Sequence, residues 1–84
     1  MQVIEKPWGH EKIWASTTDY VGKKLFIKAG HRLSKQYHEV KEETILVLSG
    51  VLMVSDAEDK ITEVYYGETY HVVPGQVHRF GATY

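Results

Sequence analysis

Residues 44–54 read TILVLSGVLMV, and this stretch decides the fold class. Two runs of β-branched and aliphatic residues, 44–49 and 51–54, lie on either side of Gly50, and the Ser49-Gly50 pair predicts a tight turn. Neither run has the 3.6-residue spacing of an amphipathic helix. We therefore expect two short β-strands here.

The same pattern of short strands and turns extends in both directions. Further strands are expected at residues 24–28, 61–66, 69–73 and 77–82, with turns at 56–59, 67–68 and 74–75. No window of about 11 residues or more combines a helical period with caps. Short strands at this spacing predict an all-β sandwich or barrel, formed as one domain by residues 1–84.

Composition narrows the class of protein. The formal net charge is −1 and there is no basic stripe, which excludes nucleic acid as the main partner. The N-terminal sequence lacks the apolar region of a signal peptide, and no stretch reaches the roughly 20 apolar residues of a membrane span. We therefore expect no membrane partner and a cytoplasmic location. Because the chain has no cysteine, nitrogen and oxygen atoms must hold any metal.

Four polar side chains could meet at one metal ion. Gln36 and His38 are two residues apart, so an extended segment directs both to the same face. A polar turn at 39–42 returns Glu43 to them, and His78 arrives from a distant strand after a Pro-Gly turn. Two imidazole nitrogens, one carboxylate and one amide oxygen suit a divalent ion, with zinc first and manganese, iron, cobalt or nickel as alternatives.

The assignments of Glu43 and Gln36 as metal ligands have alternatives. Glu42 competes with Glu43 but lies one residue out of register, and Gln36 could hydrogen-bond to a ligand instead of binding the metal itself. The remaining histidines lack this spacing and are expected to be solvated or structural; they are His10, His31 and His71.

Two motifs resemble those of the cupin superfamily. The first is the spacing Gly30-x5-Gln36-x-His38-x4-Glu43-x6-Gly50, with Gln in place of the usual first His. The second covers residues 67–78, where a Pro precedes the last metal-ligating His. It reads Pro-Gly-Gln-Val-His where Pro-x-Gly-x-x-His is usual, one residue shorter before His78.

The Gln variant is similar to that of phosphomannose isomerases, also called mannose-6-phosphate isomerases. Their Leu-Ser-x-Gln-x-His string is matched by residues 33–38, and the Pro-Trp-Gly that opens many members is matched by residues 7–9. The resemblance implies a small jelly-roll cupin, or double-stranded β-helix, that is short at its C-terminus. It implies metal ligands at Gln36, His38, Glu43 and His78, and contacts with a sugar phosphate at Ser34 and Lys41.

Three functions remain open. In a sugar-phosphate isomerase the metal acts as a Lewis acid while a base moves a proton between adjacent carbons. No catalytic residue is assigned, because the isomerases' catalytic Arg has no assured counterpart, and His31, Lys24 and Tyr37 are candidates for the base. The alternatives are an Fe(II)-dependent oxygenase and a non-catalytic cupin that binds a sugar or small acid.

We also expect a homodimer. The strands at 44–49 and 51–54 are apolar on both faces, and the edge left by a missing terminal strand would be paired or covered. The large aromatic side chains are expected to be core or dimer contacts, not ligand stackers; they are Trp8, Trp14, Tyr20 and Phe26.

Overall fold

The computed structural model describes residues 1–37 and 39–82, over which the chain forms eight β-strands and no helix. The strands are β1 Gln2–Lys6, β2 Gly9–Ser16, β3 Val21–Ile27, β4 Glu43–Leu46, β5 Val51–Ser55, β6 Ile61–Tyr65, β7 Thr69–Val72 and β8 Arg79–Ala82. The prediction of an all-β fold is confirmed. Accordingly, the described part of the chain holds no helix that could cross a membrane.

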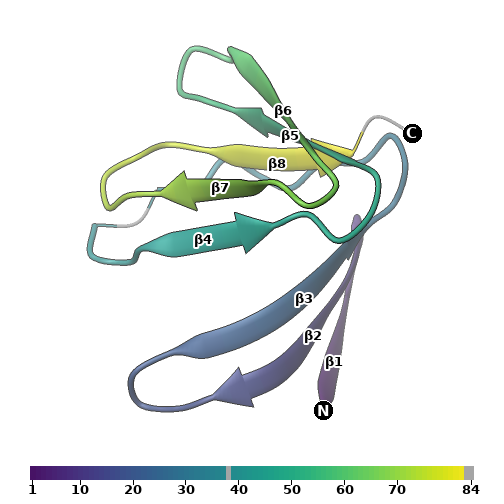
Figure 1. Cartoon of the computed structure of the whole chain (residues 1–84), viewed down its shortest axis with the longest axis vertical. Helices are drawn as coiled ribbons and strands as arrows, with labels where there is room; N and C mark the ends of the chain where they lie inside the picture. The colour runs from purple at the N-terminus through teal and green to yellow at the C-terminus, as the bar shows by residue number, and fades with distance from the viewer. Residues whose placement is uncertain (38, 83–84) are drawn as a thin grey trace.

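Antiparallel pairing arranges these strands as β1-β2-β3, β4-β7 and β6-β5-β8 (Figure 1). The expected run at 44–49 ends as a strand at Leu46, because the backbone of Val47 turns to bond with the β6–β7 connection at Gly67 and Glu68. β4 therefore pairs with β7, while β5 pairs with β6 and β8. The two apolar runs that decide the fold class thus belong to different sheets.

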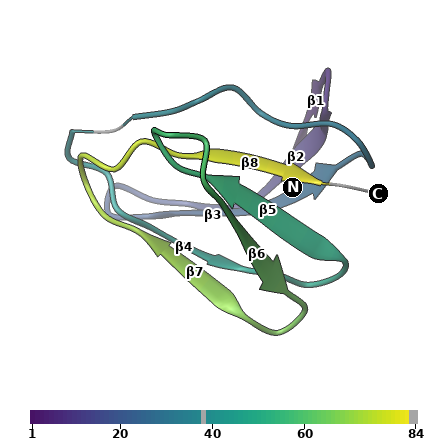
Figure 2. The same ribbon diagram turned by 90° about the horizontal axis from the view of Figure 1, so that it is seen from above.

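A strand-like segment extends the β6-β5-β8 sheet beyond β8. The backbone N–H of Gly30 donates to the carbonyl of Ala82 at 2.9 Å, and that of Leu33 donates to the carbonyl of Phe80 at 2.8 Å. Figure 2 shows the connection between β3 and β4 running alongside β8. Residues 30–36 are therefore tied to the β8 region by backbone hydrogen bonds, with two isolated bridges, Arg32–Gly81 and Gln36–His78, in place of a regular strand.

The core is small and lies between the sheets. Its buried members are Leu33, Val47, Val54, Val64, Val72 and Phe80, with Trp8, Ile27, Ile45, Leu52 and Tyr70 packed against them. Burial alternates along β4, where Glu43 and Ile45 are partly buried and Thr44 and Leu46 are exposed. This is the two-residue side-chain period of a strand that turns one face toward the core.

Two strands were not expected from the sequence. β1 and β2 form a hairpin, and β2 also pairs with β3. A Cβ atom at Gly9 would lie 1.8 Å from the carbonyl oxygen of Phe26, so only glycine allows β3 to approach the start of β2. The Pro-Trp-Gly sequence at 7–9 therefore has a physical role as the turn and close-approach point of this hairpin.

Replacing Phe80 with Ala tests the core. Phe80 is 6% exposed, so Phe80→Ala should lower the free energy of unfolding by about 3–5 kcal/mol. Tyr66→Ala is the matched control, because Tyr66 is 75% exposed and its loss should cost at most about 0.5 kcal/mol. Urea denaturation followed by circular dichroism measures both. Equal midpoints for the two variants would contradict this packing.

Candidate metal centre

The candidate site begins with a pair of residues on neighbouring strands. Gln36 and His78 exchange both backbone hydrogen bonds, with Gln36 N–H to His78 carbonyl at 2.8 Å and His78 N–H to Gln36 carbonyl at 3.0 Å. Directly opposite residues of an antiparallel pair direct their side chains to the same face. The backbone therefore sets the Gln36 and His78 side chains side by side, just before the start of β8.

His78 is the most deeply placed polar residue of the described chain, with only 1% of its surface exposed. Its Nδ1 lies 3.1 Å from the carbonyl oxygen of Gln76, and its ring packs against the ring of Phe80 at 5.0 Å between centroids. A carbonyl only accepts hydrogen bonds, so Nδ1 carries the proton of the neutral ring and Nε2 carries the lone pair. Metal-ligating histidines are commonly oriented in this way.

Glu43 approaches this ring from another sheet. It opens β4 opposite Val72 of β7, and its Oε1 atom lies 4.0 Å from His78 Nε2. Two atoms that each lie about 2.1 Å from a common ion are at most about 4.2 Å apart. The 4.0 Å between the His78 nitrogen and the Glu43 oxygen lies just inside this limit, so the two side chains would have to move closer to share an ion in a tetrahedral arrangement.

Lys41 and Ser34, the expected sugar-phosphate contacts, lie in different settings. Lys41 Nζ is 4.0 Å from Glu43 Oε1, and its side chain is 55% exposed. The ammonium group therefore lies at the solvent side of the carboxylate. Ser34 is exposed on the segment beside β8, and no distance places it next to Glu43 or His78.

His38, the fourth candidate ligand, lies outside the described residues, and its role stays a prediction. Within residues 1–37 and 39–82 no group of three or more His, Asp or Glu side chains is arranged to hold a metal ion. A metal site at His78 and Glu43 would therefore also need the Gln36 amide and His38.

The other histidines have their own partners. His71 Nε2 lies 2.7 Å from Glu42 Oε2, and its Nδ1 lies 2.8 Å from Thr44 Oγ1 across the β4-β7 pair. Glu42 is thus paired with an exposed histidine on the other face of β4, which favours Glu43 as the carboxylate near His78. The remaining two make local contacts: His10 stacks on Phe26, and His31 bonds the carbonyl of Ala29.

A cleft that the sequence did not predict lies beside Glu43. It has a volume of about 1080 Å³ and runs between β3 and the stretch from Val40 to Leu52. Lys41 and Glu43 line it, and so do Tyr20 and Phe26, whose side chains are more than half exposed. Figure 1 shows β3 diverging from β4 at this place. The cleft forms because the two sheets diverge. The spacing of residues along the sequence does not predict that divergence.

These features define an all-β, cupin-type domain with a candidate metal centre at one end of β8. Comparison with protein-family models matches residues 1–83 to the family described as mannose-6-phosphate isomerase C-terminal. The chain belongs to this family, and the resemblance read from its two motifs is confirmed. Neither the curated proteins nor the solved structures gave a match.

Substitution of His78 tests the metal centre. We expect His78→Gln to weaken the binding of Zn²⁺ or Co²⁺ about 100-fold or more, because losing a direct ligand should cost at least as much as losing its supporting hydrogen bond. His71→Gln is the matched control and should bind as the parent chain does. Calorimetry gives the affinities, and the visible spectrum of the Co²⁺ form reports the coordination.

Because His78 is buried, Glu43→Gln provides a second variant that leaves the core intact. It should also weaken metal binding, since it removes the carboxylate and keeps the shape. The assignment fails if both variants keep the parent affinity while circular dichroism shows them folded.

Proposed function

We propose that this chain is a divalent-metal-binding cupin domain that takes a sugar phosphate, with isomerisation of the mannose-6-phosphate type as its reaction. The observation that carries the proposal is the approach of Glu43 Oε1 to Nε2 of the buried, oriented His78. Membership of the mannose-6-phosphate isomerase C-terminal family supports the substrate class.

The donor set supports binding of an anionic guest. Gln36, His38 and His78 are neutral when they act as ligands, so Glu43 alone offsets the charge of a divalent ion and the site stays positive. When bound, the metal supplies Lewis acidity to the oxygens of the substrate. Lys41 adds a further positive charge 4.0 Å from Glu43, where it can meet a phosphate group at the solvent side.

Proton transfer needs a base, and the three candidates differ in position. Lys24 lines the cleft that Lys41 and Glu43 also line. Tyr37 follows Gln36 in the chain and is 57% exposed, while His31 is hydrogen-bonded to Ala29 beyond the far end of β8. The geometry favours Lys24 as the group that could reach a guest in the cleft.

Binding without turnover is the second candidate function, and the exposure of the site to water favours it. Glu43 is 21% exposed and Lys41 is 55% exposed, so the described side chains leave the site in contact with water. Isomerases gain from excluding water around the reacting carbons. A non-catalytic sugar-phosphate module would tolerate this exposure.

A substrate test separates these functions. Metal-loaded protein is titrated with mannose 6-phosphate and fructose 6-phosphate by calorimetry and is tested beside them in a coupled isomerase assay. Binding with conversion supports the isomerase, and binding without conversion supports the non-catalytic module.

Lys41→Gln should weaken binding about tenfold, because hydrogen bonds to charged groups are worth roughly 1.5–3 kcal/mol. Lys12→Gln, on β2, is the control, and absence of binding to either sugar would falsify the sugar-phosphate proposal.

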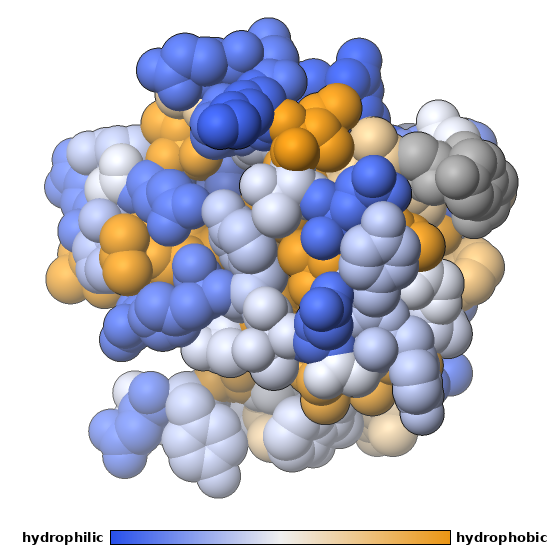
Figure 3. All heavy atoms as spheres, turned by 45° about the horizontal axis from the view of Figure 1, so that its top comes forward, coloured by the Kyte–Doolittle hydropathy of each residue, from blue (hydrophilic) through white to orange (hydrophobic). Residues whose placement is uncertain are grey.

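We also propose that the chain forms a homodimer through the apolar residues beside the cleft. Leu46 and Leu48 are 54% and 55% exposed, Tyr20 and Phe26 are 61% and 53% exposed, and all four line the cleft. Figure 3 shows that apolar patches are separated by polar side chains on the face around β5 and β6, which makes that face the less suitable one for a partner. A second copy would cover the leucines and the aromatic residues together.

Light scattering at tens of micromolar tests the dimer. We expect a mass of twice the 9.7 kDa of one chain. Leu48→Glu should shift the mass to that of the monomer, because a carboxylate is costly to bury at an interface. Tyr66→Glu, at a site on the β6–β7 turn that is 75% exposed, should leave the dimer intact. A monomeric parent chain would rule the proposal out.

A further inference from the structure

The outer face of the β6-β5-β8 sheet carries a hollow that none of the functions above uses. Side chains alternate along β8, so His78 and Phe80 face the core while Arg79 and Gly81 face outward. The hollow has a volume of about 360 Å³. The sheet itself therefore separates it from the candidate metal centre.

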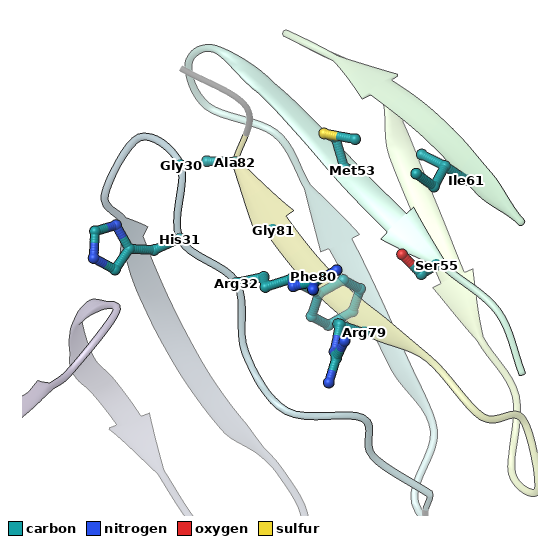
Figure 4. Close-up of a pocket in the computed structure, with 10 residues that line it drawn as sticks. All are labelled: Gly30, His31, Arg32, Met53, Ser55, Ile61, Arg79, Phe80, Gly81 and Ala82. Carbon is teal, nitrogen blue, oxygen red and sulfur yellow. The ribbon is translucent and has the colours of Figure 1, made fainter. Parts of the chain in front are cut away.

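Two arginines flank this hollow (Figure 4). Arg32 is opposite Gly81 on the segment beside β8, and Arg79 is opposite Ser55 of β5. Figure 4 shows the Arg32 side chain extending over β8, with Arg79 next to it. Both side chains therefore reach the same outward face from adjoining strands.

The backbone that carries the arginines is fixed. Hydrogen bonds on both sides of Arg32 join Gly30 to Ala82 at 2.9 Å and Leu33 to Phe80 at 2.8 Å. A Cβ atom on Gly81 would lie 2.9 Å from the Cβ of Arg32, so the glycine lets Arg32 lie close against β8. Groups held on paired strands keep a binding geometry better than groups on loops.

The charge around the hollow is positive and only partly balanced. Among the described residues, no carboxylate lies within ion-pair distance of either guanidinium group, and the buried Nε of Arg79 has no hydrogen-bond partner there. Asp59 bonds Lys35 at 2.9 Å, and the pKa of Asp59 is lowered by this lysine first and by Arg79 and Arg32 to a smaller extent. Lys35, Arg32 and Arg79 thus outnumber the two carboxylates nearby, Asp59 and Glu63, the second of which stands opposite Met53 on the same face of the sheet.

We propose that this hollow is a second binding site, for the phosphate group of a small phosphorylated molecule. Two guanidinium groups match the oxygens and the double negative charge of a phosphate monoester. The Ser55 hydroxyl can donate a further bond. Met53 and Ile61 form an apolar wall, and the volume leaves room for an organic group beside the phosphate.

Nuclear magnetic resonance with inorganic phosphate tests the site at constant ionic strength, with chloride as the reference anion. We expect saturable shifts of the amide signals of Ser55, Gly81 and Arg32 in the full chain without added metal. Arg32→Gln and Arg79→Gln should each weaken binding about tenfold or more, since each removes charge-assisted hydrogen bonds. Arg79→Lys should restore only part of the affinity, because an ammonium group cannot form the two-pronged contact.

Two control variants make the result specific. Lys24→Gln, on β3, removes the same charge from another sheet and should leave these shifts unchanged. Lys41→Gln, at the candidate metal centre, should also leave them unchanged, which distinguishes this site from the sugar-phosphate proposal. Arg32 is exposed, so Arg32→Gln stays informative if Arg79→Gln does not fold. Unsaturable shifts, or equal binding by folded Arg32→Gln and the parent chain, would overturn the proposal.

Discussion

The hydrogen-bonded ladder between residues 30–36 and the region of β8 is the constraint on which the rest of the structure depends. It sets Leu33 beside Phe80 in the core and Gln36 beside His78 at the candidate metal centre. The same ladder sets Arg32 over Gly81 on the outer face of the sheet. One set of backbone contacts therefore determines the core packing and both candidate sites, because side chains leave paired strands in alternating directions.

Much of the fold could be predicted from the sequence, but only where strands are apolar. The runs around Gly50 and after Asp59 are rich in β-branched and aliphatic or aromatic residues, and the structure has strands there. β1 and β2 were not predicted, because charged residues such as Glu5 and Lys12 interrupt their apolar pattern. Those strands owe their form to pairing with β3 and to the close approach at Gly9, which are contacts between distant parts of the chain.

The two candidate sites also differ in whether the sequence could predict them. The spacing of Gln36, His38, Glu43 and His78 predicted one shared site, and the structure pairs Gln36 with His78 and brings Glu43 within 4.0 Å of His78. Metal binding there stays a prediction. The arginine hollow could not be predicted, since Arg32 and Arg79 are far apart in sequence and become neighbours only through the register that sets Gly81 opposite Arg32. The cleft beside Glu43 likewise depends on the divergence of two sheets.

The succession His78-Arg79-Phe80-Gly81 has a consequence for how the chain folds. If β8 paired one residue out of step, its two faces would exchange. The guanidinium of Arg79 would then be buried in the apolar interior, and the ring of Phe80 would be exposed to water. Gly81 would take the core position of Phe80 and leave a cavity there. Burying an unpaired charge and losing an aromatic contact are both costly, so the shifted register is less stable than the native one. The residues that form the two faces of β8 therefore also favour its native pairing register.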